Sequence, residues 1–309
     1  MGAGEMASVS VILPCCNRLR YLKPAVESVF SQSFSDWDLI IADDGSGEET
    51  RRYLAGLGSA HVKIVSLPHS GNPSRVRNAA LAAATGRYVA FLDSDDLWTG
   101  EKLALQLAAL KGHPEARWCY TGCAPIDADG RPLQRAGRHK IERPQGWIFA
   151  QLLTLKIGIA MPTVLAERSL VQEAGGFDEL QRFGEFHDLC LRLSLRGTVV
   201  ALDEELSQVR WHDEHYSADR VGDQAGWMRL YEKMSQLAPT PSLVRHCRRM
   251  RAVTAVKLAR ELMASRDRRS ALTTLARSLP FSWQQPSFWW NLCKAASRMV
   301  RPQRGGLRP

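Results

Sequence analysis

Short apolar runs alternate with helical stretches through the first hundred residues of the chain. Each run has the length and the branched apolar content of a buried strand, and amphipathic or Ala-rich stretches lie between the runs. The predicted strands are Val9–Leu13, Trp37–Ala42, Val62–Val65 and Arg87–Leu92, and the predicted helices are about Lys23–Ser31, Glu48–Leu57 and Ser74–Ala84. This alternation favours an α/β fold with a mixed, mostly parallel sheet and helices on both faces. Ligands of such sheets bind beyond the carboxyl ends of the strands, so the residues there are the first candidates for function.

The fourth predicted strand ends in a cluster of polar and acidic residues, Asp93-Ser94-Asp95-Asp96. Asp93 and Asp95 are one residue apart, so in an extended chain their side chains point the same way and their charges repel. A divalent cation relieves this repulsion, and Mg²⁺ or Mn²⁺ prefers carboxylate and phosphate oxygens. The pair therefore fits a metal site. An exposed acidic turn that stabilises the start of the next helix has the same composition.

The ends of the first two predicted strands carry polar residues of a different kind. Asp43-Asp44-Gly45-Ser46 follows the second strand, where an Asp could accept a hydrogen bond from a base or a ribose hydroxyl. The same four residues also make a good plain β-turn. Pro14-Cys15-Cys16-Asn17 follows the first strand and contains no glycine. The absence of GxGxxG at this place and of GxxxxGK[ST] in the chain disfavours dinucleotide-binding and P-loop proteins.

The pattern is looser after residue 100. We expect a helix over Thr99–Gly112, a β-hairpin over Cys119–Arg135 that turns at Asp129-Gly130, a strand and a helix over Val164–Ala174, a helix over Asp188–Arg196, and two short strands over Val199–Trp211. From Gln224 onward the chain is helix or loop. These boundaries predict one large domain of residues 1–222 and a helical extension of residues 223–309.

The basic character of the chain belongs to its carboxyl-terminal part. The net charge is +9, and the segment from Arg245 to Pro309 holds 15 basic residues against 2 acidic ones. Apolar residues recur there at helical spacing opposite a polar and basic side: Phe288, Trp289, Leu292, Ala296 and Met299 against Asn291, Lys294, Arg298 and Arg301, with Phe281, Trp283 and Trp290 nearby. This pattern is typical of a basic amphipathic helix at an anionic membrane surface. A helix that packs its apolar face on the protein has the same pattern, and a nucleic-acid partner is a third hypothesis, without a recognised reading motif.

The cysteine content and the apolar runs of the sequence limit the kinds of site and the cellular compartment to be expected. The seven cysteines include no CxxC pair, which disfavours a zinc ribbon or a thioredoxin-like site and predicts reduced, mostly buried thiols. No apolar run approaches the roughly 18 residues of a membrane-spanning helix. The first residues show neither the basic nor the apolar part of a secretory signal. We therefore expect a cytoplasmic protein, either free or held peripherally at the cytosolic membrane face.

The order of the motifs is more specific than any one of them. The runs VSVILPCCNR, IIADDGSGEET, RVRNAALAAATGRYVAFLDSDD and GGFDE, followed by a GExxDLxLRL-like stretch, resemble the family 2 inverting glycosyltransferases of the GT-A fold. The resemblance covers about Ser8 to His212. It implies a GT-A catalytic domain that transfers a sugar from a nucleotide diphosphate donor, with uridine as the expected base and Mn²⁺ or Mg²⁺ as the cofactor.

The resemblance also assigns roles to individual residues. It implies that the nucleotide and donor sugar are bound by Pro14, Cys16, Asn17, Asp43, Asp44, Arg77, Asp93 and Ser94. Within this set Asp44 would bind the base and Arg77 the nucleotide or diphosphate. Asp95 would ligate the metal ion, together with Asp93 and His212. The acceptor would be a glycan or a lipid-linked glycan precursor.

The chain departs from the family at the catalytic base. Family members usually present Glu-Asp before the helix that begins here near Asp188, and that Asp removes the acceptor proton. This sequence reads Gly184-Glu185-Phe186-His187-Asp188, so Phe186 stands where the base is expected. Glu185 is the preferred replacement and Asp188 the second candidate. Two rival hypotheses remain: a sugar-nucleotide-binding relative with weak or no catalysis, and a basic nucleic-acid-binding protein.

Overall fold

We describe the protein from a computed structural model, which covers residues 8–133, 143–211, 219–282 and 289. The chain divides into two compact units, Met1–His215 and Tyr216–Pro309. The predicted boundary after residue 222 falls inside a continuous helix, Arg220–Leu237, of the second unit.

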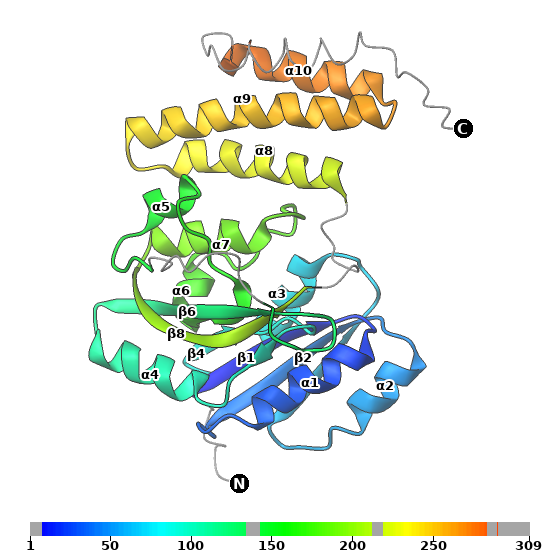
Figure 1. The fold of residues 1–309 in the computed structure, drawn as a ribbon, viewed down its shortest axis with the longest axis vertical. Helices are drawn as coiled ribbons and strands as arrows, with labels where there is room; N and C mark the ends of the chain where they lie inside the picture. Colours follow the sequence, from blue (N-terminus) through cyan, green and yellow to red (C-terminus); the bar gives the residue numbers. More distant parts are fainter. Residues whose placement is uncertain (1–7, 134–142, 212–218, 283–288, 290–309) are drawn as a thin grey trace. The chain divides into compact units, whose positions relative to one another are not determined.

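The first unit is built on one eight-stranded sheet (Figure 1). Its strands are β1 Val9–Cys15, β2 Trp37–Asp44, β3 Val62–Leu67, β4 Tyr88–Phe91, β5 Leu97–Trp98, β6 Ala116–Ile126, β7 Val164–Glu167 and β8 Thr198–Arg210. They lie in the order β3-β2-β1-β4-β7-β6-β8-β5. The neighbours β3, β2, β1 and β4 are parallel, β7 is antiparallel to both of its neighbours, and β6 is parallel to β8. The mixed, mostly parallel sheet predicted from the sequence is thus confirmed.

Helices cover both faces of this sheet. They are α1 Leu19–Phe30, α2 Glu48–Ala55, α3 Pro73–Ala83, α4 Lys102–Gly112, α5 Phe149–Leu153, α6 Arg168–Glu173 and α7 Glu185–Ser194, with a short 3₁₀ turn, η1 Met161–Thr163. Helices α1 and α4 lie on one face, and α3 and α7 on the other (Figure 1). Helix α5 packs on α7. The carboxyl ends of the parallel strands β1, β2 and β4 therefore lie at the same edge of the sheet, between the two layers of helices.

The later part of the chain differs from the prediction in two places. The segment expected to form two short strands is the single strand β8, which pairs with β6 along its whole length across several register shifts. The expected hairpin over Cys119–Arg135 is present only at its tip, where the backbone N–H of Asp127 donates to the Arg131 carbonyl oxygen, that of Leu133 donates to the Pro125 carbonyl oxygen, both at 2.9 Å, and an antiparallel bridge joins Ile126 to Pro132. The rest of β6 pairs with β7 and β8 instead. Pairing partners far along the chain compete with a local hairpin, and the sequence pattern does not reveal them.

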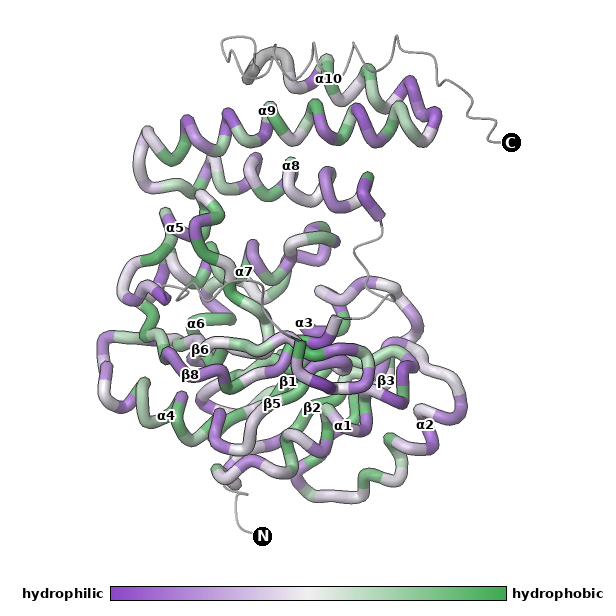
Figure 2. Tube along the Cα trace, in the orientation of Figure 1, coloured by the Kyte–Doolittle hydropathy of each residue, from purple (hydrophilic) through white to green (hydrophobic). Residues whose placement is uncertain are grey.

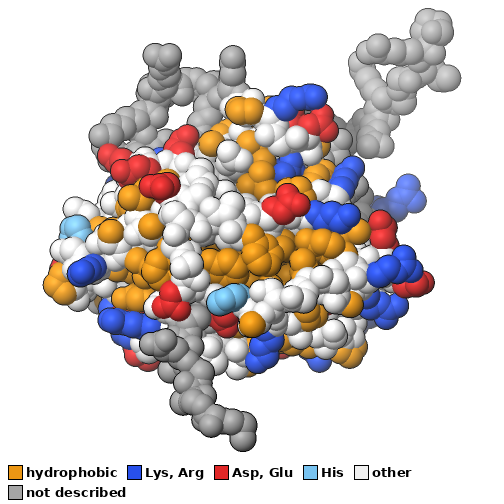
Figure 3. Space-filling view, turned by 90° about the horizontal axis from the view of Figure 1, so that it is seen from below, with side chains coloured by type: hydrophobic (Ala, Val, Ile, Leu, Met, Phe, Trp, Pro, Cys, Tyr) orange, Lys and Arg blue, Asp and Glu red, His pale blue; other side chains and the backbone are white. Residues whose placement is uncertain are grey.

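Apolar residues of the central strands make the core. Val9, Val11, Leu39, Ile41 and Ala90 are completely buried. Figure 2 shows hydrophobic residues concentrated in these strands. Strands buried on both faces are expected to be near-continuous apolar runs, and β1 and β2 have such runs in Val11–Leu13 and Leu39–Ala42. Seen from below the view of Figure 1, hydrophobic side chains form a band across the surface with charged side chains around it (Figure 3).

The second unit contains three helices, α8 Arg220–Leu237, α9 Pro241–Ala264 and α10 Arg268–Ser282. Helix α9 packs against both α8 and α10. Arg251 of α9 pairs with Glu232 of α8 at 3.2 Å, and Ala252 and Val256 form a small apolar cluster with Leu275 of α10. The helical extension expected from the sequence is present.

Candidate functional site

The ends of β1 and β2 are tied together by a network of hydrogen bonds. Cys15 lies beside Asp43 in the parallel register, and the backbone N–H of Asn17 donates to the hydroxyl of Ser46 at 2.7 Å. The side-chain oxygen of Asn17 accepts from the backbone N–H of Gly47 at 2.8 Å. Asn17 and Arg18 adopt positive φ angles of 56° and 53°, a conformation that non-glycine residues rarely take. The chain therefore leaves β1 through a turn of defined geometry.

Asp44 orders the loop that follows β3. One oxygen of its carboxylate accepts from the backbone N–H and the hydroxyl of Ser70, both at 2.8 Å, and the other accepts from the backbone N–H of Gly71 at 3.0 Å. Nδ1 of His69 lies 2.9 Å from the Asp44 carbonyl oxygen. The side chain of Asp44 is only 7% exposed. The Asp44 carboxylate is thus held by donors from the loop that follows a different strand.

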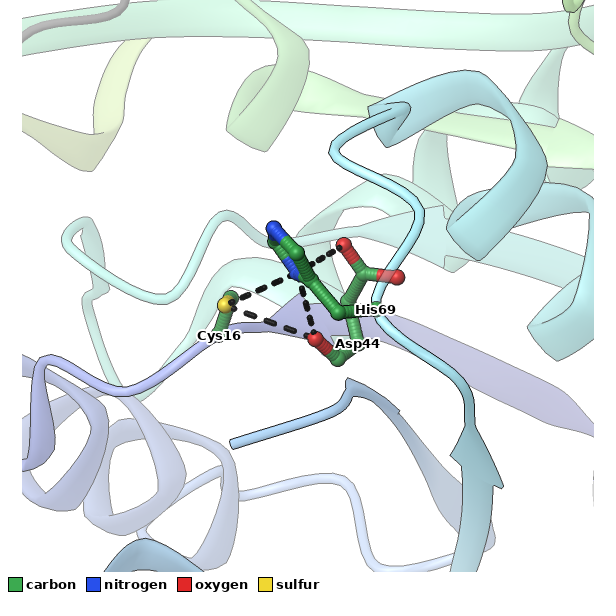
Figure 4. A group of neighbouring side chains, drawn as sticks. All are labelled: Cys16, Asp44 and His69. Carbon is green, nitrogen blue, oxygen red and sulfur yellow. Dashed lines mark hydrogen bonds and ion pairs between the residues drawn. The ribbon is translucent and has the colours of Figure 1, made fainter. Parts of the chain in front are cut away.

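Cys16, Asp44 and His69 come together beside this loop (Figure 4). One potential ligand atom from each lies within 4.8 Å of the others, which makes the three a possible metal-binding group. Burial, and the Asp44 carboxylate after it, raise the pKa of the Cys16 thiol. A metal ion would have to displace the thiol proton. Hydrogen bonds account for the cluster without a metal, since Sγ of Cys16 donates to the Asp44 carbonyl oxygen at 3.5 Å.

Asp93 and Asp95 follow β4 and are both paired with arginines. Oδ1 of Asp93 accepts from Arg77 of α3 at 2.8 Å, and Oδ2 of Asp95 accepts from Arg18 at 3.3 Å. The side chains of Asp93 and Asp95 are 28% and 16% exposed. Partly exposed carboxylate oxygens are the ligands that Mg²⁺ and Mn²⁺ prefer, so these residues fit such an ion.

Asp96 has a different environment from its two acidic neighbours. It is buried, and its Oδ1 accepts from the backbone N–H of Arg210 at the end of β8, at 2.9 Å. Burial and the nearby charges of Asp93 and Asp95 raise the pKa of the Asp96 carboxyl well above its usual value. The Arg210 guanidinium in turn donates to the Asp95 carbonyl oxygen at 2.8 Å. Asp96 therefore fastens the acidic turn to β8.

Arg77 joins the acidic turn to the start of α7. Its guanidinium donates to Asp93 at 2.8 Å and to Oε1 of Glu185 at 3.0 Å. The side chain of Arg77 is 7% exposed and that of Glu185 is 17% exposed. Burial lowers the pKa of Arg77, but the neighbouring carboxylates of Asp93 and Glu185 together raise it by more, so the net shift is upward. One cation thus holds two carboxylates from distant parts of the chain beside the same site.

Phe186 anchors the first turn of α7 in the core. It is 8% exposed, and its ring lies edge-on to Phe91 of β4, with the ring centroids 6.1 Å apart. Gly184, before the helix, has a φ of 68° and adopts the left-handed conformation that favours glycine. Phe186 occupies an inward-facing position, and the preceding residue, Glu185, is the one that reaches Arg77.

Asp188 points away from this chemistry. It is completely buried, and its Oδ2 accepts two hydrogen bonds from Arg192, at 2.9 and 2.7 Å. The Arg192 guanidinium also donates to the carbonyl oxygens of Ala174 and Gly176. Asp188 therefore stabilises the turn before α7 through Arg192. Because its side chain is not exposed, it has no access to a substrate hydroxyl, and the geometry favours Glu185 over Asp188 as a base.

The structure brings most of the predicted site residues to one edge of the sheet. Those at or just beyond the strand ends are Pro14, Cys16, Asn17, Asp43, Asp44, Asp93, Ser94 and Asp95. Arg77 and Glu185 reach the same edge from α3 and α7 through their shared contact. His212, predicted as a metal ligand, lies outside the described residues. The roles of all these residues stay predictions.

Sequence reasoning missed several residues at this edge, among them Arg18, which pairs with Asp95. His69 and Ser70 follow β3, so the strand-end position that singled out Asp44 would also have found them. Arg210 ends β8 and contacts both Asp95 and Asp96. The expected strands over Val199–Trp211 also end near Arg210, but its contacts with the acidic turn depend on how β8 pairs in the sheet, which the local pattern does not show.

The amphipathic segment predicted near the carboxyl terminus lies almost wholly outside the described residues. Trp289 is described and is 45% exposed. Within the described ranges, no helix has the length and apolar content needed to cross a bilayer.

Comparison with known sequences identifies relatives that are named glycosyltransferases. Residues 10–163 match the model of the family "Glycosyl transferase family 2". The chain is 33% identical over 217 residues to the putative teichuronic acid biosynthesis glycosyltransferase TuaG of Bacillus subtilis, an alignment covering 69% of this chain and 82% of TuaG. It is also 32% identical over 206 residues to an uncharacterized glycosyltransferase of Rickettsia bellii. That alignment covers 66% of this chain but only 29% of the larger relative.

Comparison with solved structures shows a shared fold. The crystal structure of residues 1–349 of Staphylococcus aureus TarS, in complex with UDP-GlcNAc, matches with a TM-score of 0.70 at 16% sequence identity. The match covers 96% of this chain and 93% of that one. The expected GT-A-like architecture with additional carboxyl-terminal helices is thereby confirmed.

Proposed function

The chain belongs to glycosyl transferase family 2, and on that basis we propose that it transfers a sugar, with inversion, from a nucleoside diphosphate donor to a hydroxyl of a glycan or lipid-linked acceptor. UDP is the proposed nucleotide. One observation carries the proposal: Arg77 links Asp93, at the end of the central strand β4, to Glu185 at the start of α7. This contact unites an acidic turn suited to a metal ion with a carboxylate suited to remove a proton.

Glu185 is proposed as the general base. Its Oε1 is engaged by Arg77, while Oε2 makes no hydrogen bond to the described residues. Oε2 would accept the proton of the acceptor hydroxyl as its oxygen attacks the anomeric carbon of the donor sugar. The bond from that carbon to the diphosphate oxygen breaks in the same step, and the electron pair leaves with the diphosphate. Proton removal of this kind contributes about 10²–10⁴-fold to a rate.

Asp93 and Asp95 are proposed to hold Mn²⁺ or Mg²⁺, which when bound would supply positive charge to the departing diphosphate. The chain's own residues prepare the place for the ion. Arg77 and Arg18 offset the two carboxylate charges, and the contacts of Arg210 fix the backbone of the turn. His212 remains a third proposed ligand.

The base and ribose of the donor are proposed to lie over the ends of β1 and β2. Asn17 and Asp44 stand at these ends, and the loop held by Asp44 closes one side. Both strands are next to each other, and β1 is next to β4, so one extended donor could pass from Asp44 to Asp95. Cys16 and His69 provide further polar atoms at the same place.

Metal-dependent donor binding tests this function. Calorimetric titration of UDP-sugars should show binding with Mn²⁺ that is lost in EDTA, and Asp95→Asn should lose the metal-dependent part of the affinity. Glu48→Gln, on an exposed face of α2, provides the matched control. If the affinity for the UDP-sugar were unchanged both by EDTA and by Asp95→Asn, the proposed metal role would be contradicted. Donor binding without transfer to any acceptor in a panel would favour the non-catalytic relative instead.

The basic carboxyl-terminal segment is proposed to hold the enzyme at an anionic membrane surface, next to lipid-linked acceptors. Its 15 basic residues against 2 acidic ones support this role. Sedimentation with vesicles that contain phosphatidylglycerol should show binding that weakens with added salt, and neutral phosphatidylcholine vesicles should bind little. Tight, salt-dependent binding of RNA or DNA with no vesicle binding would favour the nucleic-acid hypothesis.

A further inference from the structure

One cavity of the first unit is lined by none of the residues assigned to the donor, the metal ion or the catalytic base. It has a volume of about 500 Å³, within the usual range of ligand pockets. Thr121 and Gly122 of β6, the loop residues Arg143 and Lys156, Gln151 of α5 and Thr163 of η1 contribute to its lining. The cavity therefore draws on four separate segments of the chain.

The two charged residues that line this cavity are both basic. Arg143 and Lys156 both line it, and none of the described residues in its lining is an Asp or a Glu. The side chain of Arg143 is only 11% exposed. Its Nη1 lies 3.6 Å from Asp203, which is outside the lining and has a 68% exposed side chain. The Asp203 carboxylate and the Glu205 side chain beside Gly122 lie outside the lining, so Arg143 and Lys156 supply the charge of the lining itself.

The neighbouring residues hold Arg143 in its position. The hydroxyl of Tyr120 donates to the carbonyl oxygen of Pro144 at 2.8 Å and so ties the backbone beside Arg143 to β6. Gly122 leaves the space that the guanidinium occupies, since a Cβ atom on Gly122 would lie 2.4 Å from Nη2 of Arg143. A guanidinium fixed in this way can present two donors to one oxyanion.

The cavity lies on the side of β4 opposite to the place proposed for the nucleotide base of the donor. Thr163 immediately precedes β7, and β7 pairs with β4, which leads into Asp93. Gln151 belongs to α5, which packs on α7, the helix that begins at Glu185. In the sheet order the ends of β1 and β2 lie on one side of β4, whereas β7 and β6 lie on the other.

We propose that this cavity binds an oxyanion carried by the acceptor, a phosphate or a carboxylate group near the hydroxyl that receives the sugar. The inference rests on the proposed transferase function, because it assigns the space beyond β4 to the acceptor. Arg143 would form paired hydrogen bonds with the oxyanion and Lys156 would add a point charge. Charge-assisted hydrogen bonds of this kind are about twice as strong as neutral ones.

Binding of three matched sugars to the full chain tests the proposal. Glucose 6-phosphate, glucuronate and glucose share one ring and differ in charge at one carbon. Calorimetric titrations are made with saturating UDP and Mn²⁺, so that the donor site is already filled. Wild-type protein should bind at least one of the two anionic sugars ten or more times more tightly than glucose. The preferred anion then distinguishes a phosphate-bearing from a carboxylate-bearing acceptor.

Two variants address the same guanidinium in different ways. Arg143→Gln removes its charge, and Gly122→Ala keeps the charge but pushes the guanidinium aside. Each should reduce the preference for the anionic sugar at least tenfold, and Gly122→Ala keeps the test valid if Arg143→Gln does not fold. Arg52→Gln removes an equivalent charge from the exposed face of α2, where the side chain is 74% exposed, and should leave the preference unchanged.

The outcomes separate this proposal from the donor function. Equal binding of all three sugars by wild-type protein overturns the inference, as does a preference that survives both Arg143→Gln and Gly122→Ala. If UDP itself does not bind, the transferase proposal fails, while an anion preference lost in both variants would still support an oxyanion pocket. UDP binding without any anion preference leaves the transferase proposal standing and removes only the acceptor inference.

Discussion

Glu185 accepts a hydrogen bond from Arg77 at 3.0 Å, although 108 residues separate the two in sequence. The second arm of the same guanidinium reaches Asp93, at 2.8 Å. The contact explains how a chain with phenylalanine at the usual position of the base can still present a carboxylate to the site. Phe186 turns inward to Phe91, and the residue before it takes the outward position.

Replacement of Glu185 by Gln should separate chemistry from donor binding. The amide keeps the size of the side chain and can still accept from Arg77, but it cannot take up a proton. We expect the rate of transfer to fall by about 10²–10⁴-fold with little change in affinity for the UDP-sugar. Glu49→Gln, at an exposed position of α2, is the control. Glu185→Gln protein with wild-type turnover would show that another group is the base.

Removal of Arg77 should affect both stability and activity. Arg77→Met leaves the carboxylates of Asp93 and Glu185 close together without their shared cation. Because both carboxylates are partly exposed, we expect a loss of roughly 2 kcal/mol in the free energy of unfolding, below the range for fully buried pairs. Donor affinity and transfer should fall as well. Urea denaturation measures the loss, with Arg75→Met at an exposed position of the same helix as the control. If Arg77→Met were as stable as the wild type, Arg77 would not be stabilising Asp93 and Glu185.

Asp188 should prove structural. Asp188→Asn removes the charge that compensates buried Arg192, so we expect the free energy of unfolding to fall by about 3 kcal/mol. Transfer per folded molecule should remain close to that of the wild type, because Asp188 is completely buried. Activity is therefore compared after correction for the folded fraction seen by circular dichroism. If the Asp188→Asn protein were fully folded but inactive, Asp188 would again be a candidate for the catalytic base.

Lys102 makes stability depend on pH. The side chain is completely buried, with Nζ 2.5 Å from Oε1 of Gln106 and 4.1 Å from the centroid of the Trp98 ring. Burial lowers the pKa of Lys102 from 10.5 to about 7 in the folded protein. Between these values the unfolded chain binds a proton that the folded chain does not, so the contribution of Lys102 to stability rises with pH.

The expected gain is about 1.5 kcal/mol between about pH 7 and pH 8.5, within the limit of 1.36 kcal/mol per pH unit for one proton. Above about pH 9 the effect is opposed, because burial raises the pKa of the Cys119 thiol from 9.0 to about 12 and the folded state then retains a proton. Urea midpoints of wild type and Lys102→Met at the two pH values measure the difference. Parallel pH dependence in both proteins would exclude Lys102 as the source.

Local patterns were sufficient for the first half of the fold. The strands β1, β2 and β4 follow the apolar runs because a strand buried on both faces must be largely apolar along its length, and the half-buried strand β3 shows an apolar run interrupted by Lys63 and Ser66. The acidic turns Asp43-Asp44 and Asp93-Ser94-Asp95 were found for the same reason, since polar residues begin where the buried strand ends. The second half was predicted less well. Strand β8 pairs with β6 through register shifts, and no local signal marks such a long-range partner.

The sequence by itself determined the family, the sheet with its helices on both faces, and the strand ends at which the candidate site lies, because burial leaves a periodic trace in the order of the residues. Only the tertiary structure decided that Glu185 rather than Asp188 faces Arg77, that His69 and Arg210 join the same edge, and that Arg143 and Lys156 line one cavity. These relationships depend on contacts between segments dozens of residues apart. Such contacts are settled by how whole elements pack, and they leave no trace in the local pattern of either partner.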